Sequence, residues 1–195
     1  MIRSEQDARV RRITLAAPQN RNILTAEFAK QILAELADAE GDAETSAILI
    51  DAEGPVFCAG LDFKDPPDYA IFTFGQRASK PIVAAMQGVA TSAGVALLAN
   101  AHIVIAAQGS SFGLTDIREG RSHPGIQAAV AAILGERRTR ELALTGRIFT
   151  TPDAISWGLV HAATPAFELD DRALAVAQGL SGANPDAIRA VLTRS

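Results

Sequence analysis

Two short segments of the chain carry the residue types that acyl chemistry requires. The first, VFCAGLDFK, runs from Val56 to Lys64, and the second runs from Lys80 through Gly88 to Ala96. Each segment reads as an apolar strand that ends in a turn of small residues, and the second turn leads into an apolar helix. Two such turns side by side can direct two backbone N–H groups at one oxygen atom. This arrangement is an oxyanion hole, which stabilises negative charge on an acyl carbonyl.

Glycines and a helix start support this interpretation of the two turns. Gly60 and Gly94 let the backbone turn tightly and let a ligand come close. A helix that begins near Ala93 adds the positive end of its dipole to the exposed N–H groups. One glycine turn alone is most often only a conformational feature. Two of them with these flanking residues favour a ligand site.

The elements that must position these turns alternate along the chain. We expect strands over 10–16, 47–51, 82–86, 103–106 and 159–163, with loop over 55–67. We expect helices after an N-cap at Thr25, from Pro152 to near Gly158, and over 69–78, 93–101, 125–134, 137–144, 170–180 and 185–194. Strand–helix alternation predicts an α/β fold with largely parallel strands, whose ligand sites lie at strand ends. No Pro/Gly/Ser-rich linker is evident, so we expect one domain over 1–195.

Composition and charge argue against several classes of function. The formal net charge is −4, so no basic face for nucleic acid is evident. The longest apolar stretch, 89–101, is interrupted by polar residues and is too short to span a bilayer, and the N-terminus does not resemble a signal peptide. The single cysteine, Cys58, cannot form an internal disulfide, which suits a reducing cytoplasm. No His, Cys, Asp or Glu residues have metal-ligand spacing, so we predict no metal.

Several motifs, in the same order along nearly the whole chain, resemble the crotonase superfamily, also called the enoyl-CoA hydratase/isomerase superfamily. They are RNIL at 21–24, FCAGLDFK at 57–64, KPIVAAMQGVA at 80–90, SFGLTD at 111–116, LTGR at 144–147 and AISWGLV at 154–160. The resemblance implies a crotonase-like spiral of ββα turns, a fold shared with Clp-type proteases. It also implies a coenzyme A thioester as substrate, an enolate-type intermediate and no permanently bound cofactor.

The resemblance assigns roles to particular residues. The two oxyanion-hole N–H groups correspond to Leu61 and Ala93, where the contact comes from the backbone and the side chain can vary. The residues that correspond to the coenzyme A pocket are Leu61, Asp62, Phe63 and Lys64, together with Ile23 in the first motif. Lys64 is expected near a phosphate or ribose of coenzyme A.

The acid–base positions depart from the family pattern. Family hydratases use two glutamates, and the matching positions here are Ala96 and Asp116. A methyl group cannot transfer a proton, whereas Asp116 keeps a carboxylate. We therefore expect Asp116 to be the acid–base group, which suits double-bond isomerisation better than hydration. Glu119, about one helical turn further on, and His123, whose imidazole titrates near neutral pH, are candidates to assist it.

Two other functions stay open at this point. Residues 91–94, TSAG, also resemble the nucleophile turn of Clp-type serine proteases, so Ser92 with His123 as its base would give a hydrolase. A catalytically weak acyl-CoA-binding protein is the other alternative, because Ala96 and a short C-terminus both reduce the expected activity.

The resemblance also bears on assembly and location. It implies a homotrimer or a hexamer, a place in fatty acid metabolism, and an acyl-CoA thioester as the main partner. The family's C-terminal lid and trimerisation helices appear shortened or absent in this sequence, so we expect a more open acyl pocket. We expect a cytoplasmic protein that binds neither nucleic acid nor membrane.

Overall fold

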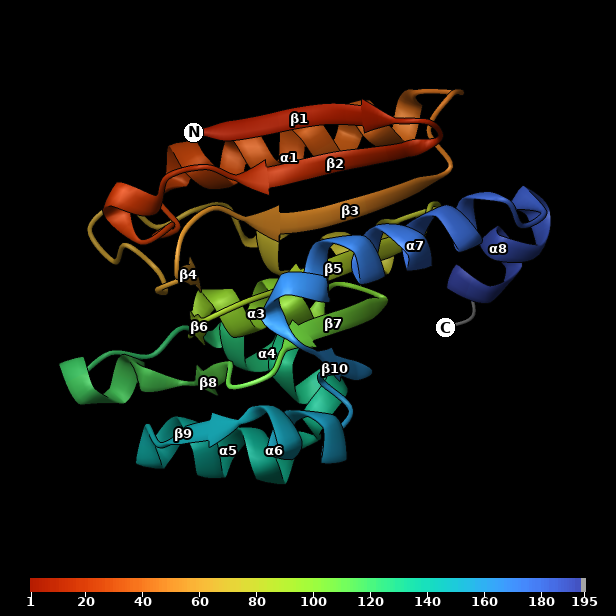
Figure 1. Ribbon diagram of the computed structural model, residues 1–195. Helices are drawn as coiled ribbons and strands as arrows, with labels where there is room; N and C mark the ends of the chain where they lie inside the picture. Colours follow the sequence, from red (N-terminus) through yellow and green to blue (C-terminus); the bar gives the residue numbers. More distant parts are fainter. Residues whose placement is uncertain (194–195) are drawn as a thin grey trace.

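Two β-sheets form the centre of the computed structural model, which describes residues 1–193 (Figure 1). The larger sheet has the order β1-β2-β3-β5-β7-β10 and the smaller one the order β4-β6-β8-β9. The strands are β1 (Ile2–Asp7), β2 (Val10–Leu15), β3 (Ala47–Ala52), β4 (Val56–Cys58), β5 (Ile82–Met86), β6 (Val89–Thr91), β7 (Ile103–Ala107), β8 (Ser111–Gly113), β9 (Ile148–Thr150) and β10 (Ala162–Thr164). Neighbouring strands run parallel except for β1 with β2 and β8 with β9.

Helices surround both sheets. The α-helices are α1 (Ala26–Gly41), α2 (Phe74–Arg77), α3 (Ala93–Ala99), α4 (Pro124–Leu134), α5 (Glu136–Thr145), α6 (Thr151–Ser156), α7 (Leu169–Ser181) and α8 (Pro185–Leu192). Four short 3₁₀ helices are η1 (Pro18–Asn20), η2 (Tyr69–Phe72), η3 (Thr115–Glu119) and η4 (Ala166–Glu168). In Figure 1, α7 crosses one face of the larger sheet, while α3 and α4 lie beyond the other face.

A strand–strand–helix unit repeats along the middle of the chain. β3 and β4 lead to η2 and α2, β5 and β6 lead to α3, and β7 and β8 lead through η3 to α4. The first strand of each unit joins the larger sheet and the second joins the smaller one. Each unit therefore adds one strand to both sheets, which confirms the predicted spiral of ββα turns.

Glycine makes the corner between the two strands of a unit possible. Gly88 lies between β5 and β6 with a φ of 71°, which favours glycine. A Cβ at Gly88 would lie only 1.8 Å from the carbonyl oxygen of Pro55, in the corner of the preceding unit. The backbone at the corner between β5 and β6 therefore packs directly against the backbone at the corner between β3 and β4. This contact keeps β4 and β6 adjacent.

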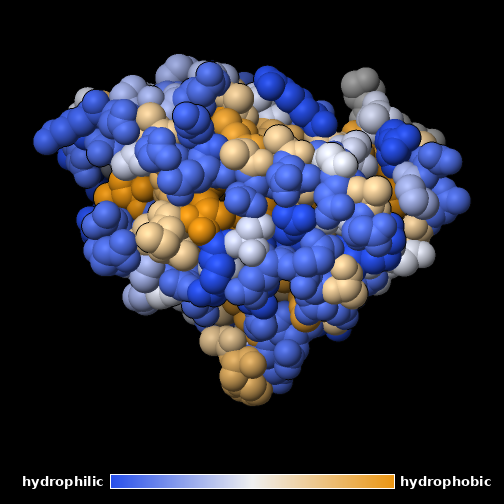
Figure 2. All heavy atoms as spheres, turned by 90° about the horizontal axis from the view of Figure 1, so that it is seen from above, coloured by the Kyte–Doolittle hydropathy of each residue, from blue (hydrophilic) through white to orange (hydrophobic). Residues whose placement is uncertain are grey.

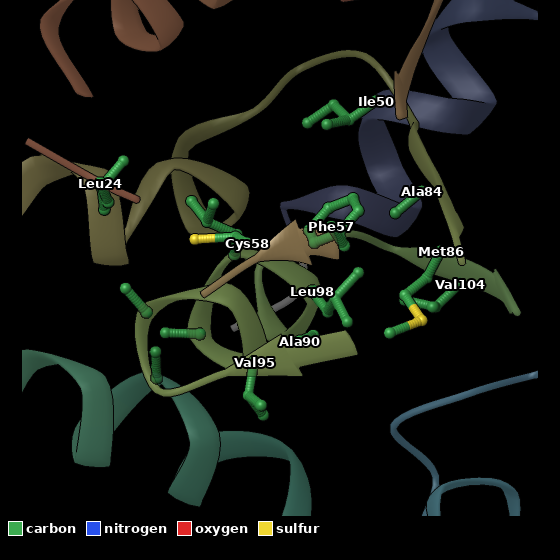
Figure 3. Packing of buried hydrophobic residues seen from close by; sticks show 14 of the residues in the cluster. Leu24, Ile50, Phe57, Cys58, Ala84, Met86, Ala90, Val95, Leu98 and Val104 are labelled. Atoms are coloured by element: carbon green, nitrogen blue, oxygen red, sulfur yellow. The ribbon is translucent and has the colours of Figure 1, made fainter. Parts of the chain in front are cut away.

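The strands of the larger sheet bury both faces, as expected for a parallel sheet. On β3, Leu49 faces α7, while Ile48 and Ile50 face the smaller sheet. Figure 3 shows Ile50 from this face near Phe57 of β4, within one continuous apolar cluster. The core therefore fixes the smaller sheet, and the turns that follow its strands, against the larger one.

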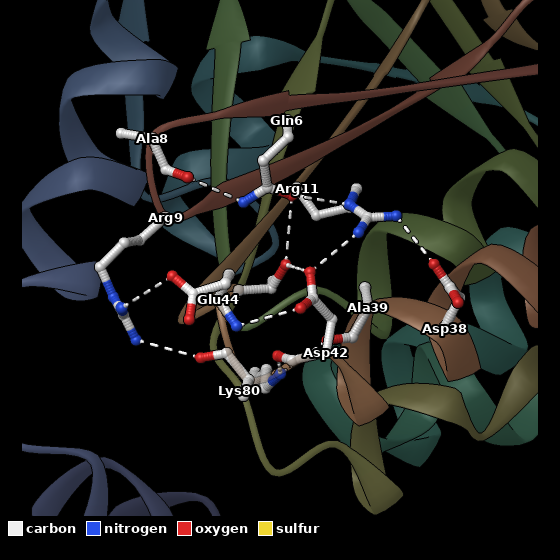
Figure 4. Close-up of polar contacts among 11 residues, drawn as sticks. Gln6, Ala8, Arg9, Arg11, Asp38, Ala39, Asp42, Glu44 and Lys80 are labelled. Carbon is white, nitrogen blue, oxygen red and sulfur yellow. Dashed lines mark hydrogen bonds and ion pairs between the residues drawn. The ribbon is translucent and has the colours of Figure 1, made fainter.

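A polar network holds the C-terminal end of α1 (Figure 4). Arg11 on β2 pairs with Asp38 and Asp42, each at 2.9 Å. The Lys80 ammonium donates to the carbonyl oxygens of Ala39 and Asp42, both at 2.6 Å. These carbonyls are the unpaired acceptors of a helix end, so Lys80 caps α1. Lys80 of the second motif is thus a structural residue.

Two histidines complete the starts of parallel strands. His102, just before β7, accepts the N–H of Ile82 through Nδ1 at 2.9 Å. His161, just before β10, accepts the N–H of Val104 in the same way at 3.0 Å. Each imidazole replaces a backbone carbonyl at the start of the neighbouring strand, so both histidines have structural contacts outside the predicted catalytic positions.

The structure differs from the sequence-based elements mainly in short segments. β1, β6, β8 and β9 lie outside the predicted strands, because β1 is charged and the others span only three residues. β4 begins the first segment, which reads as a strand followed by a turn, although it also lies within the loop predicted over 55–67. Residues 69–78 form η2 and α2 instead of one helix. The side-chain amide of Asn100 donates to the Phe72 carbonyl at 3.0 Å, at the point where one helix would continue. Strand β10 begins at Ala162 instead of 159, after a turn at Gly158 with a φ of 82°. The helix expected over 185–194 ends at Leu192, and Arg194 lies outside the described residues.

Hydrophilic residues cover most of the face shown in Figure 2, with smaller apolar areas between them. The most exposed large apolar side chains of the described chain include Phe167, Leu144 and Val191, which belong to three different elements. In residues 1–193, no helix combines the length and hydropathy that crossing a membrane requires.

Candidate active site

The two predicted turns lie side by side. β4 and β6 are parallel neighbours, so the turns that follow them leave the smaller sheet at the same edge. A Cβ at Gly60 would lie 3.5 Å from the Cβ of Ser92 and 3.7 Å from the carbonyl oxygen of Thr91. The backbone just before Leu61 therefore contacts the backbone just before Ala93.

Both predicted oxyanion-hole amides are available at this junction. Leu24 pairs with the first turn by donating to the Gly60 carbonyl and accepting from the Asp62 N–H, each at 2.9 Å. In such a pairing the N–H of the middle residue, Leu61, points away from the partner segment. Ala93 is the first residue of α3, so its N–H has no acceptor in the helix. Across residues 1–193, neither N–H donates to a protein acceptor.

Ser92 makes the sharp turn that exposes the Ala93 amide. Its backbone has φ 50° and ψ −107°, a conformation that L-residues rarely adopt. The N–H of Ser92 donates to the carbonyl of Gly113 at 2.7 Å, which ties the turn to β8. The chain thus leaves β6 and enters α3 within one residue.

Asp116 comes to this junction because β8 pairs with β6. Thr91 and Gly113 are register partners, and Asp116 follows three residues later at the start of η3. Burial raises the pKa of the Asp116 carboxyl above its ordinary value, while the nearby Ser92 hydroxyl opposes this rise. The charge of Glu119 raises this pKa further, and the basic groups of His123 and Arg121 lower it. A carboxylate with a raised pKa beside two free amides is a candidate acid–base group.

His123 lies near Asp116, but one of its two ring nitrogens already accepts a hydrogen bond. It is the N-cap of α4, and its Nδ1 accepts the Gly125 N–H at 3.2 Å. Its ring centroid lies 5.1 Å from that of Phe72 and 6.0 Å from that of Tyr69. Burial lowers the pKa of His123, although the negative charge of Asp116 opposes this. The neutral imidazole therefore carries its proton on Nε2 and can act as a donor.

Asp116 and His123 line one cavity of about 220 Å³ between η3, α4 and α5. Leu114, Ile126 and Leu144 supply apolar walls. A larger cavity, of about 810 Å³, lies at the C-terminal end of α3 beside α4 and α8, and none of the predicted site residues lines it. The smaller cavity includes the half-buried Asp116 carboxyl, while Leu61 and Ala93 are not among its lining residues.

Glu119 does not join this cavity. Its side chain is 71% exposed and approaches the Arg121 guanidinium at 3.5 Å. Arg121 in turn lies over the ring of Phe63, 5.0 Å from the centroid. No sequence pattern indicates this contact, because the two residues come from loops far apart in the chain. Arg121 thereby links the acid-bearing segment to the predicted coenzyme A loop.

The residues predicted to line the coenzyme A pocket lie together on two paired segments. Leu61 is buried, Asp62 and Phe63 are half-buried, and Lys64 is exposed. The Asp62 carboxylate accepts the Lys64 N–H at 2.9 Å, which closes a tight turn. Half-buried Ile23 belongs to the segment that pairs with this loop. The structure thus brings the five residues together, while their role toward coenzyme A stays a prediction.

The position of the first family glutamate holds a side chain that cannot transfer a proton. Ala96 lies in α3 with no exposed surface, and its N–H donates to the Ser92 carbonyl at 3.1 Å. Nearby Cys58 is also fully buried, and burial raises the pKa of its thiol to about 12. Within residues 1–193, no three His, Cys, Asp or Glu side chains are placed to hold a metal ion.

Comparison with known proteins shows the family to which this chain belongs. The family model described as Enoyl-CoA hydratase/isomerase matches residues 5–194. A probable enoyl-CoA hydratase of Mycobacterium tuberculosis is 30% identical over 95% of this chain and 77% of its own length. A mevalonyl-coenzyme A hydratase of Aspergillus fumigatus is 28% identical over 92% of this chain and 72% of its own.

A solved structure extends the match to three dimensions. The enoyl-CoA hydratase of Mycobacterium paratuberculosis superposes with a TM-score of 0.86 and 33% identity, covering 98% of this chain and 85% of that one. The motifs, the spiral of ββα turns and the family match all agree. This chain therefore belongs to the enoyl-CoA hydratase/isomerase family of the crotonase superfamily.

Proposed function

We propose that this protein acts on acyl-CoA thioesters through an enolate whose oxygen is held by the N–H groups of Leu61 and Ala93. The observation that carries the proposal is the pair of free amides on adjoining turns, with the half-buried Asp116 carboxyl on the neighbouring segment. Two N–H donors fixed by the backbone stabilise an oxyanion without having to reorganise during the reaction.

Proton transfer by Asp116 completes the chemistry. Its carboxylate removes a proton from a carbon next to the double bond or the thioester, and the electron pair moves onto the thioester oxygen. The carboxylic acid then returns the proton to a different carbon, and the oxygen becomes a carbonyl again. The raised pKa of Asp116 favours this cycle, because the group must both accept and return a proton.

The arrangement supports isomerisation of an enoyl-CoA over hydration. Hydration in the family pattern uses two carboxylates to hold and activate water, and Ala96 offers only a buried methyl at one of these positions. Hydration stays the second form of the proposal, since the relatives compared above are named as hydratases.

The hydrolase alternative has one favourable observation and two unfavourable ones. The φ of 50° at Ser92 resembles the strained turn on which serine nucleophiles sit. However, the Ser92 side chain is buried, and Nδ1 of His123 is taken by the Gly125 N–H. Simple binding of acyl-CoA without turnover is the remaining alternative.

Mass spectrometry and absorbance with 2-enoyl- and 3-enoyl-CoA thioesters test the proposal. Isomerisation moves the double bond at constant mass, hydration adds one water, and hydrolysis releases coenzyme A. We expect Asp116→Asn to lose about 10²- to 10⁴-fold in turnover while thioester binding is retained. Glu119→Gln, on the exposed neighbour, is the control and should retain turnover.

Three results would contradict the proposal. Undiminished turnover in Asp116→Asn would remove the proposed acid–base group. Covalent labelling of Ser92 by a fluorophosphonate, with coenzyme A release, would favour the hydrolase. Tight binding of thioesters without any turnover would favour the binding protein.

Assembly and location complete the proposal. A homotrimer or hexamer, a cytoplasmic location and a place in fatty acid metabolism follow from the family resemblance. Light scattering of the purified protein measures the assembly directly, and a monomeric mass would contradict this part alone.

A further inference from the structure

Ser92 combines two unfavourable features that a glycine would avoid. Its φ of 50° lies in the region that favours glycine. Its side chain is 1% exposed, and among residues 1–193 its Oγ has no hydrogen-bond partner. Strain and an unpaired buried hydroxyl are unusual in one residue, and such features concentrate at functional sites.

The pairing of β6 with β8 brings Ser92 close to the segment that carries Asp116. The register pair Thr91–Gly113 and the bond from the Ser92 N–H to the Gly113 carbonyl hold β6 and β8 together at this point. The hydroxyl is near enough to oppose the rise in the pKa of Asp116, although the two groups do not reach ordinary hydrogen-bond geometry.

A role as nucleophile fits Ser92 less well. A nucleophile needs an exposed oxygen and a base in contact with it. The Ser92 Oγ is buried, and in the described chain no imidazole nitrogen accepts from it. Asp116 is the ionisable group whose pKa the Ser92 hydroxyl affects.

We propose that Ser92 is a positioning residue whose hydroxyl binds the Asp116 carboxyl during the reaction and fixes which carboxyl oxygen faces the substrate. A serine hydroxyl can donate to the carboxylate before proton abstraction and accept from the carboxylic acid afterwards. One rotating hydroxyl therefore serves both protonation states. The inference rests on the proposed function, in which Asp116 moves the proton.

A titration of Asp116 tests the contact without relying on turnover. The side-chain carboxyl carbon of Asp116 is followed by NMR against pH in the unliganded full chain. Because the hydroxyl opposes the rise in pKa, we expect Asp116 to titrate at higher pH in both Ser92→Ala and Ser92→Gly. Ser92→Gly also relieves the strained φ, so agreement between the two variants assigns the shift to the hydroxyl.

Ser110→Ala is the matched control. Ser110 is another buried serine whose Oγ has no partner in the described chain, and it lies in the corner between β7 and β8. We expect it to leave the titration of Asp116 unchanged. An unchanged titration in both Ser92 variants would overturn the proposal.

Kinetics separate this inference from the proposed function. In the Ser92 variants we expect the acid limb of the kcat/KM profile to move to higher pH, and kcat to fall by up to about 100-fold with little change in KM. If Asp116→Asn stays active, the proposed function fails whatever Ser92 does. If Asp116→Asn is inactive and the Ser92 variants keep the original pH profile, only the positioning role fails. Fluorophosphonate labelling of Ser92 would replace that role with a nucleophilic one.

Discussion

Gly94 and Cys58 are in direct contact: a Cβ at Gly94 would lie 2.5 Å from the Cys58 carbonyl oxygen and 3.0 Å from its Cβ. The first turn of α3 therefore rests on the end of β4 with no room for a side chain. Since the Ala93 amide belongs to α3 and the Leu61 amide follows β4, this contact sets the separation of the two amides.

Gly94→Ala should therefore damage both stability and activity. The added methyl must push α3 away from β4, and such overpacking costs about 1–3 kcal/mol of unfolding free energy. Denaturant unfolding and enoyl-CoA turnover measure the two effects. Gly179→Ala in α7 is the control, because a Cβ there meets nothing within 4 Å. It should raise stability by about 0.5–1 kcal/mol and leave turnover intact. If the two variants have equal stability and equal turnover, the α3–β4 contact can accommodate a methyl group and the prediction is wrong.

The ionised carboxylate of Asp116 should lower the free energy of unfolding at neutral pH. Burial raises the pKa of its carboxyl above the ordinary 3.8, so the folded state binds the proton more tightly than the unfolded chain does. Stability then falls as pH rises from 3.8 through the folded-state pKa, and the deficit persists above it. We expect Asp116→Asn to unfold at higher denaturant concentration than wild type at pH 7.

The gain should disappear as pH falls below 3.8, where the carboxyl is protonated in both states. Urea unfolding at a series of pH values measures this convergence. Glu44→Gln, at a side chain that is 82% exposed, controls for the general loss of one negative charge. A stability difference that does not change with pH would contradict the assignment of Asp116 as an acid with a raised pKa.

The thiol of Cys58 should be inert in the native protein. It is fully buried, and burial raises its pKa to about 12, so the reactive thiolate is scarce at neutral pH. An aromatic disulfide reagent should react with one thiol per chain only after denaturation, since this is the single cysteine. Fast stoichiometric reaction of the folded protein would show that the β4 end opens readily.

Lys80 should matter for stability and not for catalysis. Its ammonium donates to the Ala39 and Asp42 carbonyls at the end of α1, and Lys80→Met leaves these acceptors without that donor. Because hydrogen bonds from a charged donor stabilise the folded state, we expect Lys80→Met to lower the free energy of unfolding by about 2 kcal/mol.

Lys30→Met, at an exposed position of the same helix, should change stability by less than about 0.5 kcal/mol. Thermal unfolding compares the two variants, and turnover measured well below the melting temperature should be alike in both. A selective loss of turnover in Lys80→Met would point to a role beyond the helix end.

The sequence was most informative where backbone shape depends on residue type. Gly60 and Gly94 predicted two close turns, and apolar segments predicted the buried strands β3, β5 and β7. These features are local, so a single sequence reveals them. The family motifs then supplied the spiral and the position of Asp116, which spacing alone would not have indicated.

Features that depend on the meeting of distant segments were not predictable. Arg121 lies over Phe63, although nothing in either loop indicates the other. The strained φ of Ser92 follows from the geometry between β6 and α3, and serine at that position gives no sign of it. The expected assistance from Glu119 has no support in its geometry, because a 3₁₀ turn directs its side chain toward Arg121 and solvent.

In the proposed function, main-chain amides of Leu61 and Ala93 bind the oxygen, and this proposal has an evolutionary consequence. Their apolar side chains contribute nothing to oxygen binding, so mutation can alter them while the charge-stabilising unit survives. The proton-moving unit consists of side chains and changes with a single codon, as alanine at position 96 illustrates. A lineage built this way can acquire new reactions by exchanging acids and bases, because the part that is hardest to reinvent is inherited with the shape of the fold.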